Sequence, residues 1–291
     1  MLTQTLASKE VLNSEFQETL HAEWGQRFSV NKKIFEEKSE FWDLVIFENN
    51  RFGRVLAIDG AVQLTEVDEP IYHEMMVHVP LLSHGNVKSV LIIGGGDGGA
   101  LREVLRHPSV ERAVLVEIDP TVIELSKKYF PSISKGAFEH PKAEIIIQDA
   151  AQYIEETKET FDVIICDSCD PEGPALVLFS SKFYGNCKAK LNKGGIFVNQ
   201  NGIPFLQKEE MQMTLTNRAP HFKHVSFFLA SVPTYIGGFL AIGWASDEEY
   251  AIHEEILQQR MNKLTGDMLY YTPAIHKASF ALPKYMLSSS S

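Results

Sequence analysis

Short stretches of alternating apolar and polar residues mark the first part of the chain. Between residues 26 and 66 four such stretches occur, RFSV, DLVIFEN, FGRVLAI and AVQLTE, and each is rich in β-branched or aromatic side chains. The last two are separated by Asp59-Gly60, a pair that favours a tight hairpin because both residues tolerate positive φ. The pattern therefore predicts a small antiparallel sheet in this part of the chain.

The pattern changes to a helical period at residues 68–82, DEPIYHEMMVHVPLL, and then to an alternation of strands and helices. Continuous apolar runs predict strands at residues 89–95, 112–119, 143–149, 161–167, 194–200, 224–231 and 237–245. The segments between the first of these strands predict helices at residues 100–107, 120–130 and 150–159. Such an alternation is typical of a parallel sheet covered on both faces. We therefore expect a doubly wound α/β domain at residues 81–291, after an antiparallel β domain at residues 1–80.

Composition and charge narrow the range of partners. The 291 residues are 44% hydrophobic, enough for a sizeable core, and 27 Lys and Arg against 38 Asp and Glu give a net charge of -11. A negative net charge disfavours binding to nucleic acid and to anionic lipid and suits a cationic small substrate. Acidic residues can also serve solubility alone. We find no signal-peptide pattern and no apolar segment of membrane-spanning length. With only three cysteines, the protein is expected to be cytoplasmic.

A glycine-rich loop, GGGDGG at residues 94–99, follows the first predicted strand of the α/β domain and opens a helix. Gly94, Gly96 and Gly99 satisfy the G-x-G-x-x-G pattern, which is shared by dinucleotide enzymes, S-adenosylmethionine enzymes and some structural turns. Asp97 discriminates among these, because a pyrophosphate at this loop would meet its negative charge. We therefore favour a ligand without phosphate, and the alternative role of Asp97 is that of a helix N-cap.

Acidic residues end the next strands of the same domain. Glu117 ends the second strand, about 20 residues past the loop, where a carboxylate can accept hydrogen bonds from ribose hydroxyls. Asp149 and Asp167 end the third and fourth strands. Ligands of open α/β sheets bind outside the carboxyl ends of the strands, so these acids should line one crevice, although each alone could be a helix cap. The predicted ligand is a nucleoside that lacks phosphate and carries positive charge.

Two further patterns point less clearly to a site. HEMMVH places His73 and His78 five residues apart, about 140° around a helix, whereas a zinc helix needs the i, i+4 spacing. Cys166 and Cys169 have the spacing of a redox or zinc pair, but a zinc site needs two further ligands and a redox pair belongs at a helix start. We expect Cys166 in the core, Cys169 in a loop, and no metal at either pattern.

Taken together, several motifs resemble the spermidine synthase family. They are GGGDGG, VEID, FDVIICDSCDPEGP, PTYIGGF and YYTPAIHKASFALP, and the likeness runs from about residue 20 to residue 285. The segment DSCDPEGP is the most specific of them, and Tyr-His-Glu at residues 72–74 matches the bacterial form. The resemblance implies a Rossmann-like fold of the S-adenosylmethionine-methyltransferase type. It also implies transfer of the aminopropyl group of decarboxylated S-adenosylmethionine to putrescine, which gives spermidine and 5′-methylthioadenosine.

The resemblance assigns roles residue by residue on the polyamine side of the site. Asp167 matches the proton acceptor, and Asp170 matches a carboxylate that binds the diamine. The other polyamine contacts that it implies are Tyr72, His73, Asp97 and Tyr235. Such a base suits the chemistry, because amines titrate near 10.4 and a protonated amine cannot attack. Glu172, the third acid of CDSCDPEGP, is expected to be a solvated loop residue.

On the nucleoside side, the resemblance implies contacts from Gly94, Gly96, Glu117, Asp149, Ala150 and Pro174, the last in a loop that closes over the nucleoside. Two residues depart from the family pattern. Trp42 stands where the family usually has Gln, and Ala150 stands where it usually has Gly. The first change replaces a side chain that contacts the nucleoside, whereas a backbone contact could survive the second.

Functions of other classes are possible alternatives. A methyltransferase that uses S-adenosylmethionine would share the fold, but Asp97 would repel the carboxylate of its cofactor. A nicotinamide dehydrogenase is disfavoured by Asp97 as well, and a polyamine-binding protein without activity is disfavoured because Asp167 and Asp170 are both present. Cadaverine and agmatine are alternative amines. No cofactor or metal is expected, since the leaving group is a neutral thioether, and the family likeness implies a homodimer or homotetramer.

Overall fold

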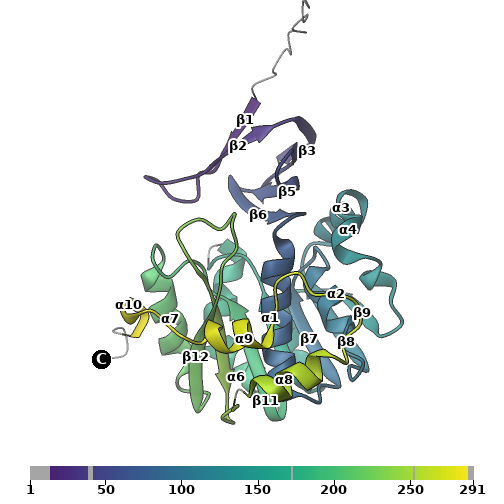
Figure 1. The fold of residues 1–291 in the computed structure, drawn as a ribbon, viewed down its shortest axis with the longest axis vertical. Helices are drawn as coiled ribbons and strands as arrows, with labels where there is room; N and C mark the ends of the chain where they lie inside the picture. Colours follow the sequence, from purple (N-terminus) through teal and green to yellow (C-terminus); the bar gives the residue numbers. More distant parts are fainter. Residues whose placement is uncertain (1–13, 39–41, 172, 252, 288–291) are drawn as a thin grey trace, which may run out of the picture. The chain divides into compact units, whose positions relative to one another are not determined.

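The computed structural model describes residues 14–38, 42–171, 173–251 and 253–287. The chain forms two compact units, Met1–Val67 and Asp68–Ser291 (Figure 1). The boundary lies before the position near residue 80 that the sequence suggests, because helix α1 (Glu69–His84) buries its apolar side chains in the core of the second unit.

The N-terminal unit contains two antiparallel sheets. Strand β1 (Ser14–Gln17) pairs with β2 (Arg27–Val30), and the other sheet has the order β3 (Lys32–Lys38), β4 (Asp43–Asn49), β5 (Gly53–Ile58) and β6 (Ala61–Thr65). The predicted hairpin is confirmed, since Asp59 and Gly60 both have positive φ, 51° and 79°. The expectation of a single sheet was wrong. Strands β1 and β3 were not predicted from the sequence, because most of their side chains are exposed and they show no apolar pattern.

Seven strands form the central sheet of the second unit. Their order is β12 (His224–Ala230), β13 (Leu240–Ser246), β11 (Leu191–Gln200), β10 (Phe161–Asp167), β7 (Ser89–Gly94), β8 (Arg112–Glu117) and β9 (Ala143–Ile147). The five strands from β11 to β9 are parallel, whereas β13 is antiparallel to both of its neighbours. The predicted doubly wound, methyltransferase-like sheet is thus confirmed. The chain reverses its winding direction between β7 and β10, and ligands of such sheets bind at this switch point.

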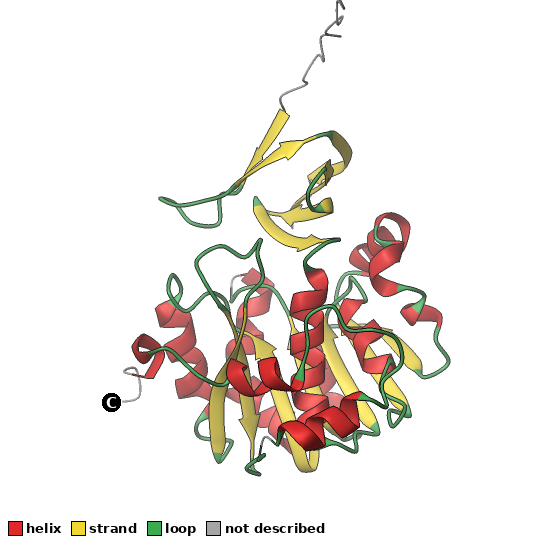
Figure 2. Ribbon diagram, in the orientation of Figure 1, coloured by secondary structure: helices red, strands yellow, loops and turns green. Residues whose placement is uncertain are grey.

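Helices cover both faces of the central sheet (Figure 2). Those that contribute to the larger core are α1, α2 (Gly99–Leu105), α3 (Pro120–Tyr129), α8 (Glu254–Met261) and α9 (Pro273–Ser279). The smaller core is covered by α5 (Ala150–Glu156) and α6 (Ser181–Ala189), and β12 and β13 are covered by α7 (Lys208–Arg218) and α10 (Lys284–Leu287). The short helices are α4 (Pro131–Ser134), η1 (Ala137–Glu139) and η2 (Gly173–Phe179).

Alternate residues of each buried strand enter the two cores. Ile92 and Ile165 belong to the larger core, and their neighbours Ile93 and Cys166 belong to the smaller one. All four are at most 1% exposed, which is why the strands are apolar on both faces. Cys166 is therefore a core residue and Cys169 is exposed, as the sequence predicts.

A buried carboxylate joins α1 to the C-terminal part of the second unit. The side chain of Glu74 accepts three backbone hydrogen bonds, from the N–H groups of Leu269, Tyr270 and Tyr271, at 2.7, 2.8 and 2.7 Å. Hydrogen bonds to a charged acceptor are stronger than neutral ones, and donors that lose their partner in the protein interior are costly. Glu74 thus holds the segment at residues 269–271 against the helix.

Replacement of Glu74 by alanine should lower the free energy of unfolding by about 2–4 kcal/mol, because it removes a buried acceptor from three N–H groups. Urea denaturation followed by circular dichroism measures this change. Glu255→Ala is the matched control, since Glu255 is exposed on α8 and should change stability by less than about 0.5 kcal/mol. Equal stability of Glu74→Ala and the wild type would contradict the assigned role.

Candidate active site

The loop at residues 94–99 lies against the end of β10. The Gly95 N–H donates a hydrogen bond of 2.9 Å to the backbone carbonyl of Asp167. Gly94 has a φ of 75°, and a Cβ there would lie 2.2 Å from the same carbonyl oxygen. Only glycine fits this close approach of two strand ends. The loop and Asp167 are therefore placed together by the backbone itself.

Three of the predicted polyamine residues meet at this point. One side-chain atom each of His73, Asp97 and Asp167 lie within 4.8 Å of one another. Tyr72 donates a hydrogen bond of 2.5 Å from its hydroxyl to Asp167 Oδ1. Its ring packs edge-on against Tyr235, with 6.1 Å between the ring centroids. The structure thus brings together the five polyamine residues other than Asp170.

Asp167 has the features of a proton acceptor. Its Oδ2 atom is buried and has no hydrogen-bond partner among the described residues. Burial raises the pKa of this carboxyl to about 6, with a further contribution from the negative charge of Asp97, while His73 and the hydrogen bond from Tyr72 oppose the increase. A carboxyl of this pKa is ionised at neutral pH and can still take up a proton.

Tyr72 and Tyr235 lie near Asp167 and interact with its charge. Burial and the charge of Asp167 raise the pKa of both Tyr72 and Tyr235 well above the ordinary tyrosine value, so both hydroxyls keep their protons. The loop that carries Tyr235 is fixed by Asp68, whose carboxylate accepts hydrogen bonds from the backbone N–H and the hydroxyl of Thr234, at 2.9 and 2.8 Å. Asp68 was not recognised from the sequence, because nothing local marks its partner in a segment 166 residues away.

His73 is enclosed by charged groups. Its Nδ1 lies 2.5 Å from Glu69 Oε2, one helical turn earlier, and its Nε2 lies 3.3 Å from Asp97 Oδ1. Burial lowers the pKa of the imidazole, but the two carboxylates more than compensate and raise it to about 10. His78 of the HEMMVH motif faces a different group of residues, since its Nε2 lies 2.9 Å from Glu103. The two histidines therefore do not share a site.

Glu117, which the sequence predicts to contact a nucleoside, lies beside the glycine loop. Its Oε1 accepts hydrogen bonds from the N–H groups of Ile118 and Asp119, at 2.8 and 3.1 Å. Its Oε2 faces the glycine loop, where a Cβ on Gly96 would lie 2.8 Å away. Burial raises the pKa of Glu117 despite the two hydrogen bonds. Glu117 and Gly96 are thus adjacent, as expected for parts of one binding surface.

Asp149 has the N-cap role that the sequence left open, whereas Asp97 does not, since the N-cap of α2 is Gly98. Asp149 is exposed and accepts a hydrogen bond of 2.7 Å from the N–H of Ala151, next to Ala150 at the start of α5. Asp97 accepts one of 2.6 Å from the N–H of Gly99. For Asp149 and Ala150 the nucleoside contact stays a prediction.

Asp170 is held by two amide side chains. Gln200, at the end of β11, donates to its Oδ1, and Gln207 donates to its Oδ2, both at 2.8 Å. Neither glutamine is marked by a motif in the sequence. Glu172 and the side chain of Pro174 lie outside the described residues, and Trp42 belongs to the N-terminal unit. The predictions for these three residues therefore stay predictions.

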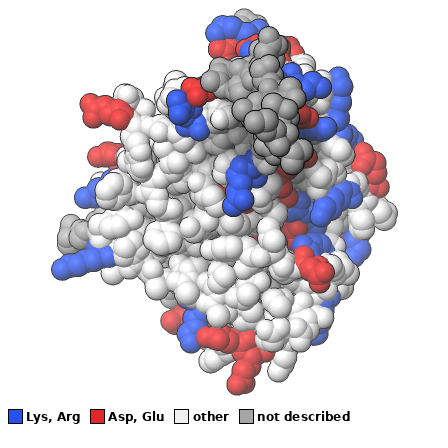
Figure 3. Space-filling model, turned by 45° about the horizontal axis from the view of Figure 1, so that its top comes forward, with Lys and Arg blue, Asp and Glu red and all other residues white. Residues whose placement is uncertain are grey.

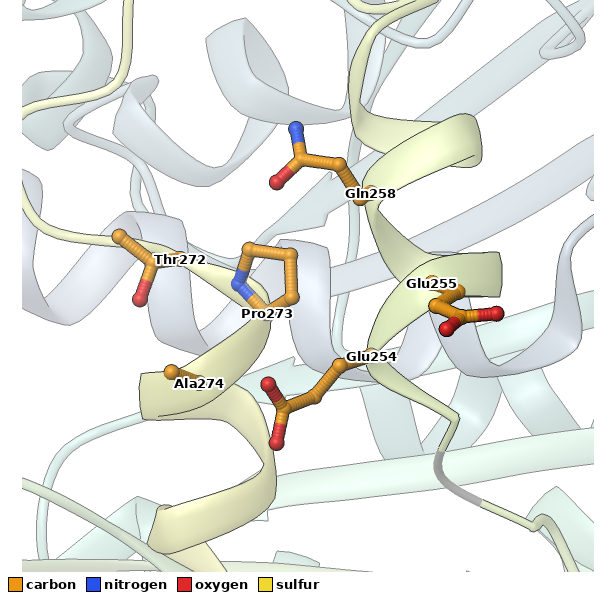
Figure 4. Close-up of a pocket in the computed structure, with 6 residues that line it drawn as sticks. All are labelled: Glu254, Glu255, Gln258, Thr272, Pro273 and Ala274. Atoms are coloured by element: carbon orange, nitrogen blue, oxygen red, sulfur yellow. The ribbon is translucent and has the colours of Figure 1, made fainter.

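Two features of the surface lie outside this site. On the face in Figure 3, Lys and Arg side chains are interspersed with Asp and Glu. A depression of about 510 Å³ between α8 and α9, shown in Figure 4, is lined by Glu254, Glu255, Gln258, Thr272, Pro273 and Ala274, none of them a predicted site residue. Within the described part of the chain, no helix combines the length and the apolar character needed to cross a membrane.

Comparison with known proteins agrees with this geometry. The family model of the spermine/spermidine synthase domain matches residues 69–255, and that of the spermidine synthase tetramerisation domain matches residues 14–66. The polyamine aminopropyltransferase of Klebsiella pneumoniae (strain 342) is 51% identical over 276 residues, which are 94% of this chain and 96% of that protein. The one from Serratia proteamaculans is 51% identical over 274 residues, with the same coverage.

Solved structures give the same result. A spermidine synthase in complex with the transition-state analogue AdoDATO has a TM-score of 0.89 and 36% identity, covering 99% of this chain and 98% of that one. The spermidine synthase of Thermotoga maritima has a TM-score of 0.87 and 35% identity, covering 99% and 97%. The chain therefore belongs to the spermidine synthase family of polyamine aminopropyltransferases.

Proposed function

We propose that the chain transfers the aminopropyl group of decarboxylated S-adenosylmethionine to putrescine, giving spermidine and 5′-methylthioadenosine, with Asp167 as general base. The observation that carries this proposal is the buried Oδ2 of Asp167, which has no hydrogen-bond partner among the described residues, while Oδ1 accepts a hydrogen bond from the Tyr72 hydroxyl. An amine N–H placed there would supply the missing hydrogen bond and could lose its proton to the same oxygen.

The reaction needs one uncharged amine. A free amine of pKa about 10.4 gives up its proton to a carboxyl of pKa about 6 at a cost of about 6 kcal/mol. The positive sulfonium of the co-substrate reduces this cost, because it disfavours a second cation next to it. The nitrogen lone pair then forms a bond to the carbon beside the sulfur, and the C–S electron pair stays on sulfur. Methylthioadenosine leaves as a neutral thioether, so the displacement itself requires no metal or cofactor.

The other predicted residues are proposed to bind either the ammonium groups of the two substrates or the ribose. Asp97 is proposed to face the aminopropyl ammonium, which is compatible with a co-substrate that has lost its carboxylate. Asp170, with both oxygens oriented by Gln200 and Gln207, is proposed to hold the distal ammonium of the diamine. Glu117 is proposed to accept hydrogen bonds from the ribose hydroxyls, beside Gly96.

Assembly and location are also proposals. The match of residues 14–66 to a tetramerisation domain supports a homo-oligomer, either a dimer or a tetramer. A biosynthetic transferase of small polar molecules suits the cytoplasm.

Incubation with decarboxylated S-adenosylmethionine and putrescine should release methylthioadenosine and spermidine, measured by mass spectrometry.

Asp167→Asn should lower turnover by about 100-fold or more, because the general base is lost. Asp162→Asn is the matched control, since Asp162 lies on the same strand but binds the N–H groups of Lys88 and Ser89 at its other end. A panel with cadaverine and agmatine separates the amines, and no methylthioadenosine with any of them would exclude the proposal.

The pH dependence provides a second test. Because Asp167 must be ionised to accept a proton and its pKa is about 6, kcat/KM should fall about tenfold per pH unit below pH 6. Tyr72→Phe removes a hydrogen bond that lowers this pKa, so the decrease should begin at a higher pH. Initial rates between pH 5 and pH 9 measure both effects. A flat profile down to pH 5 would remove Asp167 from the role of base.

A further inference from the structure

Both ring nitrogens of the buried His73 face a carboxylate. Nδ1 lies 2.5 Å from Glu69 Oε2, and Nε2 lies 3.3 Å from Asp97 Oδ1 without the alignment of a hydrogen bond. The His73 side chain is 1% exposed, with Glu69 at 5% and Asp97 at 20%, so solvent screens both contacts only weakly. The environment of this imidazole is therefore negative on both sides.

A neutral imidazole fits this environment poorly. It carries one N–H group, so whichever tautomer forms leaves one lone pair pointing at a carboxylate oxygen. In a buried place two facing acceptors repel each other at considerable cost. An imidazolium has N–H groups at both positions, so it donates a hydrogen bond to Glu69 and places a positive charge 3.3 Å from Asp97. The same state leaves no lone pair with which His73 could bind a metal ion.

Glu69 is itself fixed by a second residue, Arg102. Arg102 of α2 donates from Nη1 to Glu69 Oε1 at 2.8 Å and from Nη2 to Oε2 at 3.0 Å, a bidentate pair. It also donates to the carbonyl of Ile133 at 2.7 Å and to Glu103 at 2.6 Å. These contacts leave the Glu69 carboxylate a single orientation, with Oε2 shared between Arg102 and His73.

We propose that Glu69 and Arg102 are positioning residues that hold His73 as an imidazolium directed at Asp97. The raised pKa of His73 agrees with this state. The groups that face the imidazole from the surrounding elements are Glu69 of α1, Asp97 of the glycine loop, Asp167 of β10 and the ring of Tyr72. These carboxylates are negative and favour the protonated ring, whereas the Arg102 guanidinium, which shares Glu69 Oε2 with the imidazole, opposes protonation.

The consequence for the reaction rests on the proposed function. An imidazolium compensates the charge of Asp97, so Asp167 is the carboxylate of this cluster that is free to take up a proton. The imidazolium also lowers the pKa of Asp167 and keeps the base ionised at neutral pH. Glu69, which lies a full helical turn from His73 and is buried, acts on the base through the histidine.

The proposal is tested with Glu69→Gln, and Glu103→Gln is the matched control. Both changes remove a buried carboxylate that binds Arg102, but only Glu69 contacts His73. The imidazole is followed by ¹⁵N NMR of histidine-labelled protein without substrate, with His73→Gln to assign the signal. In the wild type and in Glu103→Gln, His73 should stay doubly protonated at pH 8. In Glu69→Gln its deprotonation midpoint should fall by about 1–3 pH units.

Kinetics provide the second readout. In Glu69→Gln the acidic decrease of kcat/KM near pH 6 should stay in place, because His73 is still protonated there, but a new decrease of about tenfold should appear above the lowered midpoint of His73, where the charge that compensates Asp97 is lost. Glu69→Asp, which retains a carboxylate, should reverse part of this effect. Glu103→Gln should leave the pH profile unchanged even where it lowers stability.

The outcomes separate this proposal from the proposed function. A singly protonated His73 at pH 8 in the wild type would overturn the inference, whether or not the protein releases methylthioadenosine. Identical shifts of the histidine signal in Glu69→Gln and Glu103→Gln would overturn it as well. If Glu69→Gln does not fold, the wild-type titration and Glu69→Asp still decide the question.

Discussion

The site depends on one constraint: two carboxylates, Asp97 and Asp167, lie close together where little water can screen them. Two buried like charges at this distance repel each other, and the repulsion is one reason why the pKa of Asp167 rises. The structure can hold both carboxylates because they have different partners. Asp97 has His73 and the N–H of Gly99 as partners, whereas Asp167 has one tyrosine hydroxyl and one free oxygen.

The scaffold enforces this proximity through helix α1 and the glycine loop. The helix carries Tyr72 and His73 to the site, and its Glu74 binds the C-terminal segment on another side. The loop can approach because it lacks side chains at the contact points: a Cβ on Gly99 would lie 2.2 Å from the imidazole of His73. A side chain at Gly99 would therefore displace the histidine.

The acidic residues near the strand ends differ in burial and in hydrogen-bond partners. Asp167 can move a proton, Asp170 is oriented by two glutamines, and Asp149 caps a helix while it stays exposed. The same residue type thus has different partners and burial at each position, which supports the separate roles of base, anchor and cap that we propose. The proposed function relies on this difference in burial and partners, because it asks one acid to bind an ammonium group and another to take up a proton.

The sequence alone determined the features that depend on local periodicity and backbone chemistry. The parallel strands, the hairpin at Asp59-Gly60, the glycine loop and the acids at the strand ends were all predicted, because each follows from neighbouring residues. The edge strand at residues 32–38 was not, since its exposed side chains leave no pattern. Only the tertiary structure decided which acids face each other and which partners they have. Tyr72 and Asp167 are 95 residues apart, and Arg102 and Glu69 are 33 apart. The desolvation and charge pairing that set their chemistry exist only once these residues are packed together.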